Sequence, residues 1–399
     1  MVYVPLSKVY HKCPAEHESV YAKRFNAPST THFGFSIRQY GRRNEYPAFF
    51  CYTEEFALLL ETIYQKHEQL LRSLGEVSTL LMRQFELFSV VEEVRATSDI
   101  EGVHSTRREI EDVVNGASRS PRFSSIVGKY LALDGHTDFR FETCEDIRVF
   151  YDEFVHREIA AEEPSHKLDG KLFRKDTAQI FSATGKIIHQ GVQPETKIIE
   201  LLEVALKILN AEEIPLLVRV SVFHYLFEYV HPFYDGNGRT ARFIVSYFLS
   251  RRFHKLIALR LSLSIKRRKK FYYDLFAETD SQWNCGDLTP FVIGFTKIIA
   301  ATFDELVPPL EAKIKQLIKF KERLKALVCG DALTFRLYEI LLESSVFFAQ
   351  GVCMDELIGL TRKSRNTIKM RLDSMPKEHL LKGGGKKIFY KLNMGMFRT

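Results

Sequence analysis

The chain has 399 residues, of which 45% are hydrophobic, a composition that supports sizeable buried cores and excludes a wholly disordered protein. Its six cysteines are scattered and form no CxxC pair, so neither structural zinc nor a disulfide framework is indicated, and a reducing, cytoplasmic location is expected. The formal net charge is +7, but residues 311–399 contain 18 Lys/Arg and 9 Asp/Glu, so this C-terminal region carries +9 and the rest −2.

The first four-fifths of the chain reads as mainly helical. Residues 1–52 form short mixed segments, and residues 55–94 show a helical pattern with a break at Gly75. Further helical patterns occur at 143–158, 194–210, 214–230, 239–252, 266–279 and 288–325. No stretch approaches the run of about 18 apolar residues that a membrane helix needs, and the N-terminus has no apolar segment typical of a secretory signal, so we expect no membrane partner.

One segment interrupts the helical pattern. The sequence TAQIFSATGKIIHQGV (177–192) has two runs rich in β-branched and aromatic residues on either side of Ala183-Thr184-Gly185-Lys186. This pattern predicts a β-hairpin.

The C-terminal region changes character. Short helical patterns at 334–344, 354–361 and 365–375 precede a strand, a glycine turn and a strand at 380–393, which predicts a winged helix-turn-helix. Its basic residues are Arg362, Lys363, Arg365, Lys369 and Arg371 near the third helix, and Lys382, Lys386 and Lys387 on the wing. DNA binding through residues 360–391 is one hypothesis; the alternatives are protein binding or packing on the rest of the chain.

A polar loop follows the apolar helix at 214–230 and reads HPFYDGNGRTAR (231–242). Asp235-Gly236-Asn237-Gly238 predicts a tight turn, and the unpaired N–H groups of the next helix would form an anion site beneath it. Arg239 and Arg242 lie three residues apart on one helix face, where they can hold phosphate oxygens. Asp235 suits Mg²⁺, and His231 can accept a proton near neutral pH. Each residue alone has a structural explanation, but together they predict a phosphate-handling active site.

This loop resembles the Fic family signature, HPFx(D/E)GNGRxxR, at every specified position. The resemblance covers roughly residues 80–300 and implies a helical core with a hairpin flap, which transfers AMP from ATP, with Mg²⁺, to a Ser, Thr or Tyr hydroxyl of a target protein or of the chain itself. It implies that His231 is the general base, Asp235 the Mg²⁺ ligand and Phe233 a buried anchor. The nucleotide-binding residues that it implies in this loop are Gly236, Asn237, Gly238, Arg239, Thr240, Ala241 and Arg242.

A second motif, TSDIEG (97–102), puts Thr97 and Glu101 four residues apart on one helix face, with Gly102 as a helix C-cap. Alone, this pattern usually marks an ordinary helix end. Beside the loop it resembles the inhibitory motif of the family, (S/T)xxxE(G/N). The resemblance implies that Glu101 pairs with Arg242, opposes the γ-phosphate of ATP and holds the enzyme inactive.

Three further segments resemble parts of the family. The hairpin around Thr184, Gly185, Lys186 and Ile187 resembles the flap that binds the target segment by strand addition and borders the nucleotide. KKFYYDLFAETD (269–280) resembles the helix whose tyrosines line the nucleotide pocket; Tyr272 and Tyr273 are the candidates, with Asp280 as a further one. GKLFRKD (170–176) resembles the segment before the flap, with Gly170 and Arg174 as the matching residues.

The expected fold is therefore mainly α: a Fic helical bundle core with a small β-hairpin flap, plus a C-terminal winged helix-turn-helix. The expected division is an N-terminal region (1–80), a catalytic core (81–305) that includes the inhibitory helix (84–103), and a linker helix with the winged unit (306–399). Two other functions stay open: removal of AMP or transfer of another phosphate-linked group at the same loop, and a nucleotide-sensing, DNA-binding regulator. The target protein and the preferred nucleotide are not indicated, and a homodimer is compatible with the resemblance.

Overall fold

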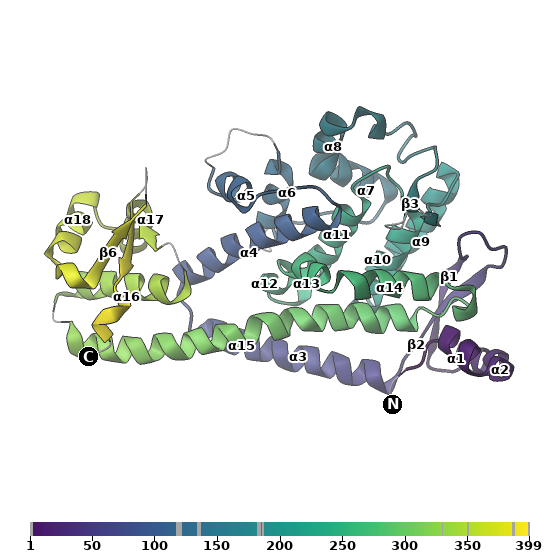
Figure 1. Cartoon of the computed structure of the whole chain (residues 1–399), viewed down its shortest axis with the longest axis horizontal. Helices are drawn as coiled ribbons and strands as arrows, with labels where there is room; N and C mark the ends of the chain where they lie inside the picture. Colours follow the sequence, from purple (N-terminus) through teal and green to yellow (C-terminus); the bar gives the residue numbers. More distant parts are fainter. Residues whose placement is uncertain are drawn as a thin grey trace. The chain divides into compact units, whose positions relative to one another are not determined.

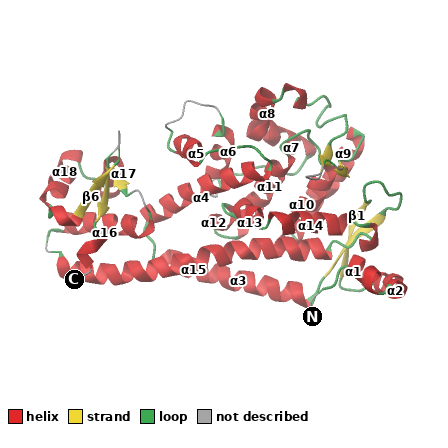
Figure 2. Cartoon of the chain, in the orientation of Figure 1, coloured by secondary structure: helices red, strands yellow, loops and turns green. Residues whose placement is uncertain are grey.

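The computed structural model describes residues 3–116, 122–133, 137–181, 185, 187–328, 330–348, 351–384 and 388–397. These residues are mainly helical, with three small antiparallel sheets among them (Figure 1 and Figure 2). They divide into two compact units, of which the first contains residues from 1–67 and 86–303 and the second 68–85 and 304–399. The divisions fall inside three long helices: α3 (Glu54–Gly75), α4 (Thr79–Ile100) and α15 (Thr289–Leu327). The three-part division expected from the sequence stays a prediction.

The first unit begins with two short helices, α1 (Leu6–Lys12) and α2 (Pro14–Phe25), and a β-hairpin that the sequence did not indicate. In the hairpin, β1 (Thr30–Ile37) pairs antiparallel with β2 (Tyr46–Cys51). Phe49 and Phe50 of β2 are fully buried. The hairpin is therefore an integral part of the core of this unit, because large aromatic side chains gain the most from burial.

The rest of the first unit is a bundle of helices around α10 (Leu216–Val230). The apolar sequence of α10 leaves no broad polar face, and the helix is accordingly buried on nearly all sides and packs against α9 (Glu195–Asn210) and α11 (Asn237–Arg252). The other helices of the bundle are α5 (Arg107–Val114), α6 (Ser124–Leu131), α7 (Cys144–Tyr151), α8 (Arg157–Glu162), α12 (Lys255–Ala258), α13 (Leu261–Arg267) and α14 (Lys269–Asp280).

Two predicted helices differ from the observed ones. The pattern at 143–158 is divided into α7, a π-helical turn at Asp152–His156, and α8, which continues to Glu162. The predicted helix 266–279 is interrupted at Arg268, which separates α13 from α14. Apolar periodicity did not reveal either break, because both keep the same helix faces turned to the core.

The hairpin predicted at 177–192 is present. β3 (Gln179–Phe181) pairs antiparallel with β4 (Ile187–Gln190), with Gln179 opposite Gln190 and Ile180 opposite His189. Thr184 and Lys186, two residues expected to border the nucleotide, lie outside the described residues. Gly185 is exposed and has φ +77°, a conformation that favours glycine.

The second unit ends with α16 (Ala332–Phe347), α17 (Met354–Thr361) and α18 (Arg365–Ser374), close to the predicted bounds. A three-stranded antiparallel sheet in the order β5-β7-β6 accompanies them, formed by β5 (Val352–Cys353), β6 (Leu380–Gly383) and β7 (Phe389–Leu392). Lys386 and Lys387 lie outside the described residues. The designation of this unit as a winged helix-turn-helix stays a prediction.

Among the described helices of both units, none combines the length and the apolar character that a membrane span requires.

Candidate active site

His231 lies directly after α10 and has φ +52°, in the left-handed region that non-glycine residues rarely adopt. Its N–H donates to the carbonyl of Phe227 at 2.9 Å, which ends the helix. Its own carbonyl accepts from Nε of Arg174 at 2.7 Å. These two bonds hold the histidine backbone in its strained conformation.

Arg174 connects the flap to this loop. Its fully buried guanidinium donates to the carbonyls of His231, Asp176, Val192 and Val230. These acceptors belong to the segments on both sides of the flap and to the end of α10. The resemblance had singled out Arg174, but only the structure identifies it as the residue that ties the flap to the histidine.

The loop after His231 is built on Phe233. This side chain is fully buried, and its ring stacks on Tyr151 with centroids 3.6 Å apart and an angle of 9°. The Asn237 side chain accepts from the N–H of Phe233 at 2.9 Å and donates to its carbonyl at 2.8 Å, so it braces the loop. Gly236 has φ +81°, and a Cβ there would lie 2.8 Å from Ile159. The turn therefore requires glycine at Gly236 for both conformation and space.

The helix α11 begins under this turn at Asn237, and its N-terminal N–H groups face the site. A Cβ at Gly238 would collide with Oε1 of Glu101, so the absence of a side chain lets an anion approach the helix end. The N–H of Thr240 already donates to the carbonyl of Gly236, and the side chains of Thr240 and Ala241 are buried in the helix. An anion bound at this helix end would therefore contact the backbone N–H groups of the residues before Thr240.

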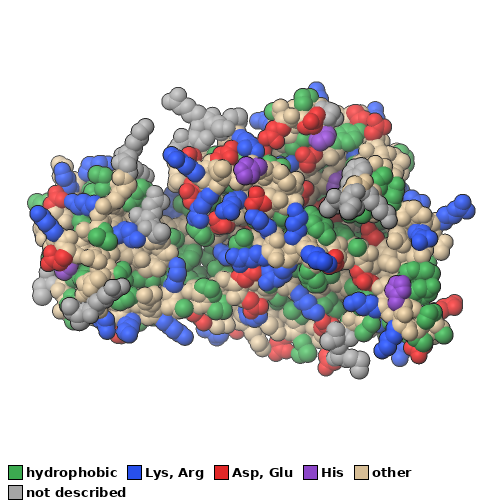
Figure 3. Space-filling model, viewed as in Figure 1, with side chains coloured by type: hydrophobic (Ala, Val, Ile, Leu, Met, Phe, Trp, Pro, Cys, Tyr) green, Lys and Arg blue, Asp and Glu red, His purple; other side chains and the backbone are tan. Residues whose placement is uncertain are grey.

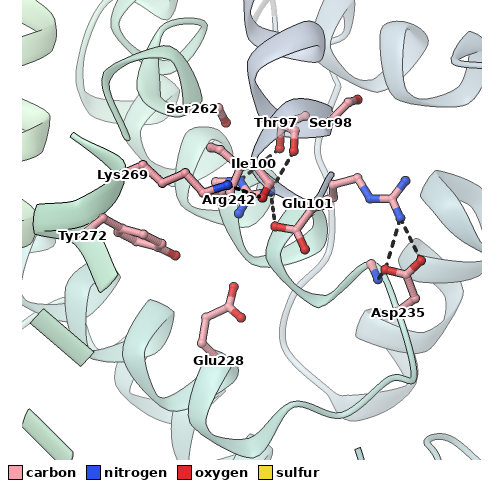
Figure 4. Close-up of polar contacts among 12 residues, drawn as sticks. Thr97, Ser98, Ile100, Glu101, Glu228, Asp235, Arg242, Ser262, Lys269 and Tyr272 are labelled. Carbon is pink, nitrogen blue, oxygen red and sulfur yellow. Dashed lines mark hydrogen bonds and ion pairs between the residues drawn. The ribbon is translucent and has the colours of Figure 1, made fainter. Parts of the chain in front are cut away.

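Both arginines of the loop are buried, with side chains 1% exposed, and each contacts a carboxylate. Figure 4 shows the contact between Arg242 and Glu101. Arg239 lies 3.4 Å from both carboxylate oxygens of Asp235. Arg242 donates to Oγ1 of Thr97 at 3.0 Å, to the Thr97 carbonyl at 3.1 Å and to Oε1 of Glu101 at 2.8 Å. The two ends of the TxxxE motif thus bind the same guanidinium.

Glu101 follows the last residue of α4, and Gly102 after it has φ +78°. The end of α4 is held by the α13–α14 segment, where Lys266 pairs with Asp99 and Lys269 donates to the carbonyl of Ile100 at 3.2 Å. Burial alone would raise the pKa of Glu101, but the charges of Arg242 and Arg239 hold it below its usual value. The glutamate is therefore an anion at neutral pH.

The two ionisable groups at the end of α10 are shifted in opposite senses. Burial lowers the pKa of His231 to about 4, helped by nearby His189 and Arg174 and opposed by Glu101, so the imidazole is neutral at physiological pH. Burial raises the pKa of Glu228 to about 8, helped by the charge of Glu101. Sequence reasoning missed Glu228, although a carboxylate in the apolar run VFHYLFEYV was a visible signal.

A pocket of about 530 Å³ adjoins these residues. Tyr272 and Tyr273 contribute to its wall together with Ile187 of the flap and Glu228. Tyr272 is buried and its hydroxyl is 2.7 Å from Nε2 of His224, whereas Tyr273 is 44% exposed. The structure therefore brings the predicted aromatic residues and the described end of the flap into one pocket.

Asp280 lines the same pocket, but its carboxylate is engaged elsewhere. Oδ1 accepts from the Tyr225 hydroxyl at 2.6 Å, and Oδ2 lies 3.7 Å from Nδ1 of His189. It therefore supports the pocket wall.

Asp235 is the one predicted metal ligand. No group of three or more His, Cys, Asp or Glu residues able to hold a metal ion occurs in the described parts of the chain. The Asp235 side chain is 34% exposed beside the anion site. A single accessible carboxylate fits Mg²⁺, which is usually held by one or two carboxylates together with substrate phosphates and water.

Comparison with known proteins shows where this chain is similar to them. Residues 146–249 match the model of the Fic/DOC family. The curated protein adenylyltransferase fic-1 of Caenorhabditis briggsae is 31% identical over 105 residues, and that of Caenorhabditis elegans 39% identical over 75 residues. These matches cover 26% and 18% of this chain, and they span 19% and 13% of the relatives' own lengths.

A solved structure, a Fic family protein from Desulfovibrio desulfuricans G20, shares the fold with a TM-score of 0.52 at 20% identity. The similarity covers 86% of this chain and 96% of that one. These similarities show that residues 146–249 form a segment similar to the Fic/DOC family, and that the chain shares the fold of the solved protein.

Proposed function

We propose that this protein is a protein adenylyltransferase, which transfers AMP from ATP to a hydroxyl of a target protein or of itself. The carrying observation is the loop at 231–242, where a neutral histidine with a side chain 17% exposed adjoins a helix N-terminus and two buried arginines. Transfer of a phosphoryl group to a hydroxyl needs a general base close to an anion-binding site. The names of the curated relatives support the same reaction.

In this reaction the target hydroxyl oxygen attacks the α-phosphorus of ATP, the bond from that phosphorus to the pyrophosphate oxygen breaks, and the hydroxyl proton passes to the His231 ring. The backbone N–H groups at the start of α11 and the Arg239 guanidinium would stabilise the phosphate charge. Asp235 would hold Mg²⁺, which neutralises part of the phosphate charge when it is bound. The chain's own contribution is positioning, charge stabilisation and one proton transfer.

We further propose that Glu101 inhibits this reaction. Its carboxylate engages Arg242 at 2.8 Å and lies against Gly238 at the start of α11, where a phosphate would be seated. An anion there opposes the γ-phosphate and keeps Arg242 from binding it. The Glu101 side chain is 22% exposed, so water can replace the contact when the glutamate moves.

Incubation with α-labelled ATP and Mg²⁺ tests both proposals. We expect Glu101→Gly to raise incorporation of labelled AMP at least roughly tenfold, because one inhibitory contact is worth a few kcal/mol. Glu142→Gly is a matched control, since Glu142 is an exposed turn residue of the same unit. If the folded Glu101→Gly protein labels neither itself nor proteins of a cell extract, the transferase proposal is wrong; labelling equal to wild type contradicts inhibition alone.

A further inference from the structure

Glu228 has a buried carboxyl that the proposed reaction does not use. It lies in the last turn of α10, one helical turn before His231, and its side chain is 13% exposed. Oε1 is buried and has no hydrogen-bond partner, and Oε2 is 3.9 Å from Nδ1 of His231, too far for a hydrogen bond. A buried acceptor without a donor is costly, and native proteins keep few of them without a reason.

Most other polar side chains that line the pocket are already engaged. Tyr272 bonds to His224, Asp280 to Tyr225, and His189 to the Tyr229 carbonyl. Glu228 therefore differs from these neighbours in being a lining residue with a carboxyl oxygen that has no hydrogen-bond donor. Its pKa, raised to about 8 first by burial, is consistent with a carboxyl that lacks a compensating donor.

The position of Glu228 indicates what kind of group would supply the donor. Figure 4 shows its carboxyl directed toward Glu101, with Tyr272 on one side and Asp235 on the other. The loop around Asp235 is the phosphate end of the site, and Tyr272 and Tyr273 provide aromatic faces on which a base can stack. In a nucleotide, the sugar lies between phosphate and base, and carboxylates commonly bind ribose hydroxyls.

We infer that Glu228 binds the ribose hydroxyls of the nucleotide and makes the site selective for ribonucleotides over deoxyribonucleotides. The inference rests on the proposed function only in that a nucleotide occupies this pocket. It concerns binding and not transfer, so it can be tested without any AMP transfer.

The test uses ADP. Because ADP lacks the γ-phosphate that Glu101 opposes, it can be titrated into the wild-type protein. Calorimetric titration at pH 7 with ADP, 2′-deoxy-ADP and 3′-deoxy-ADP should show ADP binding tighter than at least one deoxy form by roughly threefold or more, the range for a hydrogen bond to a neutral carboxyl, which is the form that a pKa of about 8 gives Glu228 at this pH. Glu228→Ala should bring that ratio close to one, mainly by weakening ADP. Glu200→Ala removes an exposed carboxylate of α9 outside the pocket and should leave the ratio unchanged.

Equal affinities for ADP and both deoxy forms in the wild type overturn the inference, as does a Glu228→Ala protein that keeps the wild-type ratio. If Glu228→Ala does not fold by circular dichroism, Glu228→Met fills a similar volume without a comparable acceptor, and it should also bring the ratio close to one; a ratio equal to wild type contradicts the inference. If the wild type selects ribonucleotides but the Glu101→Gly variant transfers no AMP, only the transferase proposal is rejected. If the Glu101→Gly variant transfers AMP but the wild type shows no ribose selectivity, only the role of Glu228 is rejected.

Discussion

The arginines of the loop at 231–242 and those of the C-terminal part of the second unit make ion pairs of similar length in very different surroundings. Arg242 and Glu101 are 2.8 Å apart, and Arg365 and Asp355 of the C-terminal unit are 2.9 Å apart. The Arg242 side chain is 1% exposed, but the Arg365 side chain is 63% exposed. The strength of an ion pair depends on the medium as much as on distance, so equal geometry here predicts unequal consequences.

In the loop at 231–242, the two arginines depend on their partners because their side chains are only 1% exposed. Removing the carboxylate leaves a buried guanidinium charge uncompensated, which costs several kcal/mol. In the C-terminal unit, Arg365, Arg371 and Lys382 each pair with an aspartate at the surface. Figure 3 shows Lys and Arg side chains scattered over the visible face of this unit rather than joined in one stripe. Water, salt or a phosphate can replace such pairs at little cost.

The largest effect is expected at the most constrained group, His231. In a Glu101→Gly background, His231→Asn should lower AMP transfer by about 10²–10⁴-fold, because the proton acceptor is lost. Asparagine tolerates the left-handed backbone of this position better than alanine does, so the fold should survive. Transfer is measured with α-labelled ATP, and activity close to the parent variant would contradict the role of His231.

The second prediction tests the comparison directly through stability. Arg242→Met should reduce the free energy of unfolding by about 3 kcal/mol, because it leaves Glu101 without its buried partner and removes the bonds to Thr97. Arg365→Met should change it by less than about 1 kcal/mol. Urea denaturation followed by circular dichroism measures both. Equal losses would mean that burial does not distinguish the two pairs.

The third prediction concerns pH. His231 acts as a base only when it is neutral, and its pKa of about 4 means that protonation begins only well below neutrality. Transfer by the Glu101→Gly variant should therefore vary little with His231 titration between pH 6 and 8 and fall about tenfold per unit below about pH 4, as far as the fold persists. A transfer rate that rises through pH 6.5 would indicate a solvent-exposed histidine and would contradict the lowering of its pKa by burial.

The smallest effect is expected at the surface of the C-terminal unit. If this unit binds duplex DNA, Lys363→Glu with Lys369→Glu should weaken binding by roughly tenfold at about 50 mM salt and reduce its salt dependence, since both side chains are exposed. A gel shift with random duplex measures this change. If the wild type shifts no DNA at low salt, DNA binding is rejected. The buried Arg242–Glu101 contact, by contrast, should not weaken over the same range of salt concentration.

Much of the site could be predicted because its signals are local. The glycine turn, the helix start at Asn237 and the spacing of Arg239 and Arg242 follow from residues within one loop. Glu101 could be assigned because its motif resembles a known one, and the structure brings it to Arg242 although 141 positions separate them. The N-terminal hairpin was missed although Phe33, Phe35 and Ile37 of β1 alternate with Gly34 and Ser36, because β2 shows no alternation and its last four residues are all buried. The break at Arg268 was missed because the helix faces continue through it.

The apolar helix, the turn and the chemical types of the groups in the loop at 231–242 can be derived from the sequence alone, because backbone conformation and helical spacing are properties of neighbouring residues. Which charged groups face each other, and how far the pKa of each is shifted, depends on the tertiary structure. The neutral state of His231 and the free acceptor of Glu228 both result from burial among side chains from distant segments. Burial and electric field are set by the whole fold, so no local pattern could reveal them.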